Sequence, residues 1–161
     1  SRLLPSHKNA AFCAQSICHL SFIIEDMACE LCETDGGALI WRFDDCRVVL
    51  VDEPGYPGFC RAIWNTHIAE MTDLTETERA RFMRVVFGLE SALRELLRPD
   101  KINLASLGNV TPHLHWHLIP RFRGDPHFPN PIWGAQIRHP VAPARACADM
   151  MKALAEKLSR L

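Results

Sequence analysis

Three histidines alternate with large apolar residues in one short stretch of the chain, at His113, His115 and His117. A period of two is typical of a β-strand, which sends alternate side chains to opposite faces, so we expect the three imidazoles to share a face. Each imidazole carries a donor and an acceptor that must be paired or solvated, which indicates a chemical site rather than a core surface. The opposite face would carry Leu114, Trp116 and Leu118.

Two kinds of chemistry suit this row of histidines. Neutral imidazole is the usual nitrogen ligand of zinc, so the strand could contribute to a metal site. An imidazole can also act as a nucleophile and attack phosphorus. A strand whose polar outer face is simply rich in histidine is the less specific alternative. The rest of the sequence has to decide between these interpretations.

A Cys-x-x-Cys pair, Cys29 and Cys32, is the second group with chemical potential. Outside a disulfide framework, such a pair is a metal knuckle or a redox pair. A redox pair is expected to open a helix after a strand, but here the turn sequence Thr-Asp-Gly-Gly of residues 34–37 follows. This favours zinc over thiol redox chemistry, and two unlinked thiols remain the alternative.

The segment from His113 to Arg121 resembles the signature of the histidine triad (HIT) superfamily, His-φ-His-φ-His-φ-φ with φ apolar, and every position fits. This is a superfamily of nucleotidyl hydrolases and transferases, and the similarity runs from about Cys29 to Arg121. The resemblance implies the HIT fold, usually dimeric, in which the middle histidine attacks the α-phosphorus of a nucleotide. A covalent nucleotidyl-imidazole forms and is then resolved. His115 would be this nucleophile, with His113 and His117 as the other catalytic residues.

The chemistry of imidazole agrees with this assignment. With an ordinary pKa near ~6.5, His115 is largely neutral at pH 7, and its attacking lone pair is correctly placed if the other nitrogen donates to a strand carbonyl. His117 would donate to the phosphate or the leaving group. Asn103 and Asn109 could supply neutral donors to the developing charge. Many family members have Gly-Gln-Ser/Thr-Val before the triad, whereas this chain has Gly-Asn-Val-Thr, which places Val110 where the hydroxyl donor would be.

Asp52 follows the predicted strand 46–51, where the family places an acidic residue that binds ribose hydroxyls. A carboxylate is a good bidentate acceptor for a cis-diol, and a turn aspartate before Pro54 is the alternative. Leu50 and the neighbouring hairpin residues would then border the base. The substrate itself stays open, because dinucleoside polyphosphates, nucleoside phosphoramidates and adenylylated intermediates all present the same α-phosphate.

The resemblance also suggests a complete zinc site. Some HIT relatives and the galactose-1-phosphate uridylyltransferase branch carry a zinc histidine at the end of the third strand, which corresponds to His67, and the first triad histidine completes the site. Cys29, Cys32, His67 and His113 would then hold a tetrahedral structural zinc. Unmetallated thiols and a loop-capping His67 are the alternative. No catalytic metal is required, and the competing function is a non-catalytic nucleotide-binding or zinc-binding module.

The elements that position these residues predict an α+β fold with a mostly antiparallel sheet, one long central helix and a C-terminal helix. Thr75 and Glu78 form a capping box that starts the long helix, and Pro99 stops it, so this helix spans about 75–98. A stripe of apolar residues at helical spacing marks its core face. The strands are expected at 38–43, 46–51, 59–64, 101–107 and 114–119.

Two further segments carry less pattern. Residues 120–143 are rich in proline and follow the histidine strand, so they are either functional or a surface wrap. Residues 144–161 have an apolar face and predict an amphipathic terminal helix. We expect a HIT domain at 27–161 and an N-terminal extension at 1–26, because the latter has no clean period and lacks the features of a signal peptide.

The amino-acid composition limits the kinds of partner that we expect for this protein. The 161 residues carry a net charge of −1 and are 48% hydrophobic, as in an ordinary globular domain with one core. No basic stripe predicts a nucleic-acid polymer as partner, and no apolar run approaches the ~20 residues of a membrane span. Seven cysteines without a regular framework predict a reducing compartment, the cytoplasm. The expected partners are a small nucleotide substrate and a second copy of the chain in a homodimer.

Overall fold

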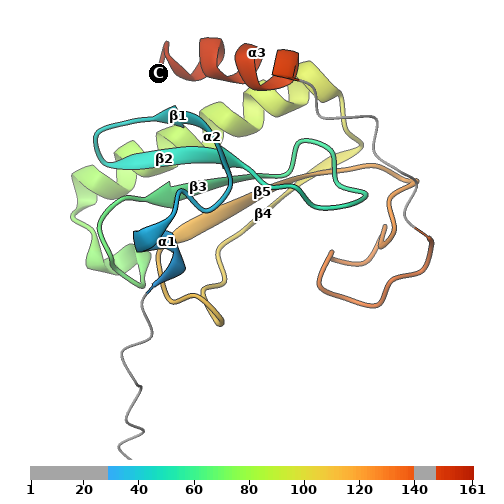
Figure 1. Ribbon diagram of the computed structural model, residues 1–161, viewed down its shortest axis with the longest axis horizontal. Coiled ribbons are helices and arrows are strands. Elements are labelled where there is room, and N and C mark those ends of the chain that lie inside the picture. The colour runs from blue at the N-terminus through green and yellow to red at the C-terminus, as the bar shows by residue number, and fades with distance from the viewer. Residues whose placement is uncertain (1–28, 140–147) are drawn as a thin grey trace, which may run out of the picture.

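A computed structural model describes residues 29–139 and 148–161, and their fold is α+β (Figure 1). Five strands form one sheet in the order β1-β2-β3-β5-β4, and each neighbouring pair is antiparallel. The predicted fold class is therefore confirmed. The elements are α1 (Glu30–Glu33), β1 (Ala38–Arg42), β2 (Cys46–Leu50), β3 (Cys60–Trp64), the 3-10 turn η1 (Met71–Asp73), α2 (Glu76–Leu97), β4 (Lys101–Ala105), β5 (His115–Arg121) and α3 (Ala148–Leu158).

The observed element ends lie close to the predicted ones. The strand and long-helix ends differ from the expected positions by at most two residues. The predicted N-terminal extension, residues 1–26, lies outside the described residues, as does the expected first turn of the terminal helix at 144–147.

The histidine strand β5 lies inside the sheet, between β3 and β4. In its pairing with β3, Arg61 lies opposite His117 and Ile63 lies opposite His115. Directly opposite residues of antiparallel strands share a face, so these four side chains lie together on one face of the sheet. Because β5 begins at His115, His113 lies just before the strand, as the predicted strand 114–119 also had it.

The long helix α2 starts and stops where its local sequence requires. The Thr75 hydroxyl accepts the Glu78 backbone N–H at 3.3 Å, and the Glu78 carboxylate accepts the Thr75 backbone N–H at 2.8 Å. At the other end Arg98 takes a left-handed conformation with φ of 49°, and Pro99 follows it. Because a residue before proline disfavours the α region, the helix ends there. The buried side chains of α2 are Phe82, Val85, Val86, Leu89, Ala92 and Leu93.

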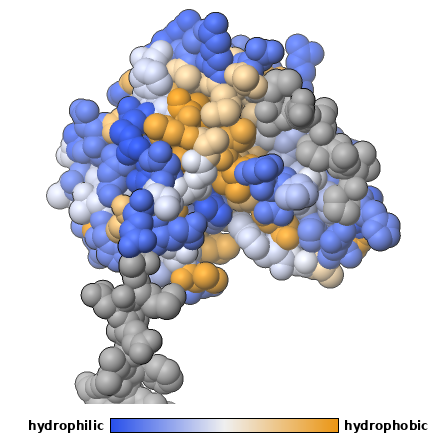
Figure 2. All heavy atoms as spheres, viewed as in Figure 1, coloured by the Kyte–Doolittle hydropathy of each residue, from blue (hydrophilic) through white to orange (hydrophobic). Residues whose placement is uncertain are grey.

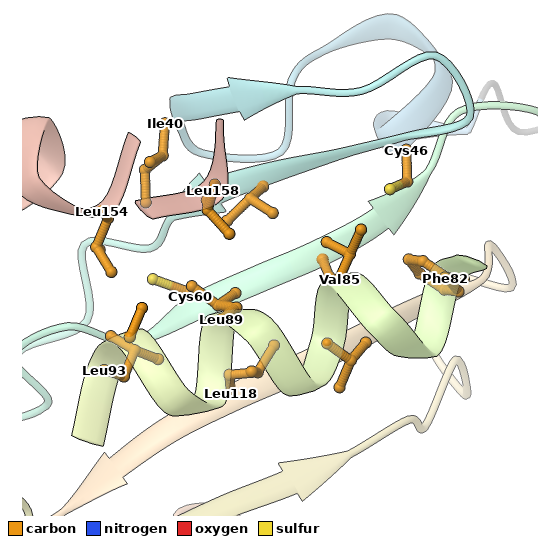
Figure 3. Packing of buried hydrophobic residues seen from close by; sticks show 14 of the residues in the cluster. Ile40, Cys46, Cys60, Phe82, Val85, Leu89, Leu93, Leu118, Leu154 and Leu158 are labelled. Atoms are coloured by element: carbon orange, nitrogen blue, oxygen red, sulfur yellow. The ribbon is translucent and has the colours of Figure 1, made fainter. Parts of the chain in front are cut away.

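The main core lies between the sheet and the helices α2 and α3. Figure 3 shows labelled side chains of α2 and α3 in one cluster with residues of the sheet, among them Cys60 of β3 and Leu118 of β5 close to Leu89 of α2. Leu154 and Leu158 of α3 are buried in the same cluster. The even-numbered positions of β5 thus serve the core, which leaves its histidines on the opposite face.

Residues 122–139, which follow β5, contain no helix or strand but are tied to the sheet by a buried ion pair. The Arg121 guanidinium donates to both carboxylate oxygens of Asp125, from Nε at 2.7 Å and from Nη2 at 3.0 Å. The two side chains are only 2% and 1% exposed. The same carboxylate accepts the backbone N–H groups of Phe122, His127 and Phe128.

The described surface is ordinary for a globular domain. The face seen in Figure 2 is mostly hydrophilic, with apolar residues gathered in its middle and a smaller apolar group near its lower edge. Within the described residues, no helix combines the length and the apolar composition needed to cross a membrane.

Candidate functional site

His115 and His117 form a close pair on the face of the sheet away from α2. Their Nε2 atoms are 3.0 Å apart, and their ring centroids are 4.7 Å apart with the planes at 78°. The Nδ1 atom of His115 lies 2.6 Å from the backbone carbonyl oxygen of His113. A carbonyl only accepts, so Nδ1 must carry the proton and Nε2 keeps its lone pair. The sequence analysis predicted a backbone carbonyl as the partner of this nitrogen, and the carbonyl comes from the residue just before the strand.

Burial and charge keep this pair neutral. Burial lowers the pKa of His115, and the positive charge of Arg61 lowers it further. Burial, together with the charges of His115 and Arg61, lowers the pKa of His117 to about 3. Both imidazoles are therefore unprotonated on one nitrogen at pH 7, as a nucleophile and a neutral donor require. The Nδ1 atom of His117 is buried and has no hydrogen-bond partner among the described residues.

A second cluster gathers the four residues predicted to hold zinc. The Nδ1 atom of His113 lies 3.4 Å from the Cys29 Sγ and 3.5 Å from the Cys32 Sγ, and the Cys32 Sγ lies 3.3 Å from the Nδ1 of His67. All four ligand atoms lie within 4.8 Å of one another. Zn–S and Zn–N bonds of ordinary length at a tetrahedral angle place sulfur and nitrogen about 3.5 Å apart, which matches these distances.

The orientation of His113 also suits a metal. Its Nε2 atom lies 2.6 Å from the backbone carbonyl oxygen of Trp64, so Nε2 carries the proton and the lone pair of Nδ1 faces the sulfur atoms. A metal-bound histidine usually donates its other N–H in this way to a carbonyl or carboxylate. The residues present therefore fit a four-coordinate structural zinc ion, which would be supplied with two thiolates and two imidazoles.

Arg47 holds the backbone around the cysteine pair, a role that the sequence analysis did not predict. Its side chain is 4% exposed and donates to three carbonyl oxygens of the segment, those of Leu31 at 2.5 Å, Asp35 at 3.0 Å and Thr34 at 3.2 Å. It also donates to the Asn65 side-chain oxygen at 3.2 Å. The donors of one arginine on β2 thus fasten α1 and its following turn to the sheet.

The residues predicted to bind substrate differ in their exposure to solvent and in their hydrogen bonding. Leu50 is half-buried at the end of β2, and Asp52 is exposed two residues later. Asn109 is exposed in the loop before β5. The side-chain oxygen of Asn103 accepts a hydrogen bond from Arg121 at 2.6 Å, so this side chain is partly committed to holding residues 122–139.

Trp133 is a site neighbour that sequence reasoning missed. Its ring centroid lies 5.2 Å from that of His117, in an edge-to-face arrangement at 69°, and the residue is 52% exposed. It lies 16 positions after His117, on the segment held by Arg121 and Asp125, so no local sequence pattern predicts the contact. Of the two interpretations of this segment, a surface wrap or a functional element, the contact favours the second.

The comparisons with known proteins agree with this geometry. The family model described as the HIT domain matches residues 35–124. The AP-4-A phosphorylase of Mycobacterium tuberculosis is 28% identical over 107 residues, which are 63% of this chain and 55% of that protein. The chain thus spans about half the length of this relative. The structure of a histidine triad protein from Marinobacter aquaeolei is 29% identical, has a TM-score of 0.67 and covers 79% of this chain and 92% of its own.

A zinc-bound histidine triad family protein from Mycobacterium smegmatis shares the fold, with 23% identity, a TM-score of 0.59 and coverage of 83% of this chain and 95% of that one. With its triad motif at the start of β5 and a family match over more than half of its length, the chain belongs to the HIT domain family.

Proposed function

We propose that the protein is a nucleotidyl hydrolase or transferase that acts at the α-phosphate of a nucleotide through a covalent intermediate on His115. One observation carries this proposal. The hydrogen bond from His115 Nδ1 to the His113 carbonyl leaves the Nε2 lone pair on a buried, neutral imidazole beside a second histidine. An imidazole held in this tautomer is ready to attack phosphorus without a base to remove its proton.

The reaction would proceed in two displacements. In the first, His115 Nε2 forms a bond to the α-phosphorus, and the bond to the leaving group breaks and takes its electron pair away. In the second, an oxygen of water or of another acceptor bonds to phosphorus, the N–P bond breaks with its electron pair returning to Nε2, and the acceptor proton goes to solvent. His117 would donate its Nε2 proton to a phosphoryl oxygen, since the lone pair of His115 that receives it in the free protein is then used.

The substrate class rests on the predicted residues and on the relatives. Asp52 would accept the ribose hydroxyls, and Leu50 would border the base. Asn103 and Asn109 would supply amide donors near the phosphates. The M. tuberculosis relative is named for AP-4-A, and a dinucleoside polyphosphate or nucleoside phosphoramidate is the type of substrate we propose here.

We propose that Cys29, Cys32, His67 and His113 bind zinc in a structural role. The support is the gathering of the four donor atoms within 4.8 Å of one another, and the orientation of His113 by the Trp64 carbonyl. A bound zinc would tie the N-terminal knuckle to the residue two positions before the nucleophile. It would not touch His115, whose free nitrogen points to His117 instead.

Mass spectrometry of the quenched protein tests the enzymatic proposal. We expect a nucleotidyl adduct on the peptide that contains residues 113–121 after mixing with a dinucleoside polyphosphate or a nucleoside phosphoramidate. The adduct should be missing in His115→Asn and should persist in excess chelator during a short incubation. Nucleotide binding without adduct or turnover across the substrate panel would instead identify a binding module.

We also propose a homodimer. Strands β1 and β4 form the two edges of the sheet, and an open edge has backbone groups available for pairing with another chain. Light scattering at micromolar concentration should give twice the 18.2 kDa of the chain. A monomer mass across that range would contradict the proposal.

A further inference from the structure

Arg61 lies beside the catalytic pair, although no motif in the sequence points to it. It is the second residue of β3, directly opposite His117 of β5 on one side and Val49 of β2 on the other. Opposite residues of an antiparallel pair have their Cβ atoms about 4.5–5.5 Å apart on the same face. The side chain of Arg61 therefore rises from the sheet next to His117, on the face that carries His115.

The guanidinium of Arg61 is poorly satisfied in the free protein. Its Nη1 donates to the Gly36 carbonyl at a long 3.3 Å, and its Nε is buried without a hydrogen-bond partner among the described residues. No carboxylate of the described residues lies within 4 Å of it. Burial lowers the pKa of the half-buried Arg61, and the charges of Glu30 and Glu53 act on it without forming an ion pair. A partly desolvated cation with no direct ion pair and an unpaired donor is unfavourable for an arginine that has only a structural role.

Two buried arginines on this face, Arg47 and Arg121, show what a structural role looks like. Arg47 uses its donors on three backbone carbonyls and one amide oxygen. Arg121 is paired with a buried carboxylate and donates in addition to Asn103 and Asn130. Arg61 resembles neither, because it retains unused donors next to the nucleophile.

We infer that Arg61 is a phosphate-binding residue that donates to a non-bridging oxygen of the phosphoryl group attacked by His115. A phosphoryl oxygen would supply the missing acceptor and the missing negative charge together, and the planar guanidinium is well suited to it. The inference rests on the proposed function. It adds a cation to the imidazole and amide donors as a means of stabilising charge in the displacement.

Binding measurements that separate phosphate from nucleoside test this role. Calorimetry gives the affinity of each variant for adenosine 5′-monophosphate and for adenosine. We expect Arg61→Gln to bind the monophosphate about 10- to 100-fold more weakly, the range for one lost charge-assisted hydrogen bond, and to bind adenosine as the wild type does. Arg61→Lys keeps the positive charge but loses the planar pair of guanidinium donors, so its affinity for the monophosphate should lie between those of the wild type and Arg61→Gln. Arg42→Gln, which alters an exposed arginine paired with Asp35, is the matched control and should bind both ligands normally.

A stability measurement separates this role from a structural one. Arg61→Met keeps the apolar stem and removes the uncompensated charge, so its melting temperature without ligand should equal or exceed that of the wild type, while its monophosphate affinity falls. A lowered melting temperature of Arg61→Met, or equal losses for monophosphate and adenosine, would show that Arg61 only supports the fold. This variant also decides the matter if Arg61→Gln fails to fold.

The outcomes distinguish the inference from the function on which it rests. If the wild type gains affinity from the phosphate and Arg61→Gln and Arg61→Met retain that gain, the inference is overturned and the proposed function stands. If the wild type binds neither the monophosphate nor adenosine, and forms no adduct, both are overturned.

Discussion

His113 and His115 stand two residues apart, yet they are anchored through opposite ring nitrogens. His113 donates from Nε2 to the Trp64 carbonyl and turns Nδ1 toward two sulfur atoms. His115 donates from Nδ1 to the His113 carbonyl and turns Nε2 toward His117. In both cases a backbone carbonyl selects the nitrogen that keeps its lone pair. The same motif therefore suits His113 for the proposed metal site and His115 for the proposed nucleophilic attack, through different ring nitrogens.

The backbone around the two residues explains the difference. His115 starts β5, and its carbonyl oxygen accepts the Ser106 hydroxyl at 2.8 Å. His113 precedes the strand, where its N–H donates to the Thr111 carbonyl in a tight turn. A residue outside the regular strand does not have to follow the alternation of side chains, so its ring is free to turn toward the cysteine pair.

Removal of the nucleophile should give the largest effect. We expect His115→Ala to lower turnover by at least about a thousandfold, because no other group carries the covalent step, while nucleotide binding and zinc content stay measurable. Steady-state kinetics and elemental analysis on the same preparation check this. The exposed His139, changed to alanine, serves as the control. Near-normal turnover in His115→Ala, or a loss of zinc from it, would contradict the assignment of separate roles to His115 and His113.

Removal of the cysteine pair should affect the proposed metal site that includes His113. In Cys29→Ser/Cys32→Ser we expect zinc to be lost and the free energy of unfolding to drop by roughly 3 kcal/mol or more, as loss of a structural metal does. Part of the activity should remain, because His115 keeps its own carbonyl anchor. Elemental analysis and urea unfolding measure the first two effects.

A buried thiol away from the cluster provides the control for that variant. Cys60 is fully buried in the core, so Cys60→Ala should lower stability without changing the zinc content. Full retention of zinc in the double variant would refute the assignment of the four ligands.

A smaller effect concerns the pH dependence of stability. The pKa of His117 is lowered to about 3 in the folded protein, so between that value and its ordinary 6.5 the unfolded chain binds a proton that the folded chain does not. Stability contributed by the neutral ring is complete above pH 6.5 and is lost as the pH falls toward 3. In His117→Gln we expect the slope of unfolding free energy against pH to be smaller by up to about 1.4 kcal/mol per unit.

Urea unfolding of wild type and His117→Gln between pH 7.5 and pH 4.5 measures this slope. Any release of the proposed zinc at low pH would act on both proteins alike and so would cancel in the comparison. Identical slopes would show that His117 is not buried as a neutral ring.

The features that the sequence predicted are those set by local pattern. Three of them depend only on neighbours within a few positions, so the local sequence is enough to predict them. They are the alternation of residues in β5, the capping box of Thr75 and Glu78, and the end of α2 before Pro99. The gathering of Cys29, Cys32, His67 and His113 followed from family resemblance rather than from spacing alone. The assignments of Asp52, Leu50, Asn103 and Asn109 remain predictions.

What the sequence did not disclose depends on which strands become neighbours. Arg61 meets His117 only because β3 pairs with β5 in one particular register, and a shift of one residue would turn its side chain to the other face. Arg47 and Trp133 likewise reach their partners across 12 or more positions of the chain. The local sequence around such a cationic or aromatic residue does not indicate which distant residues its side chain will contact.

The ion pair of Arg121 and Asp125 has a consequence for how residues 122–139 open to solvent. Three amide hydrogens are bound by one buried carboxylate, so these amides should exchange with deuterium as slowly as those of a strand, although no strand is present there. Since the same carboxylate holds them all, they should open together. Each opening would carry Trp133 away from His117, so the wall of the site and the isotope exchange of this segment report a single event.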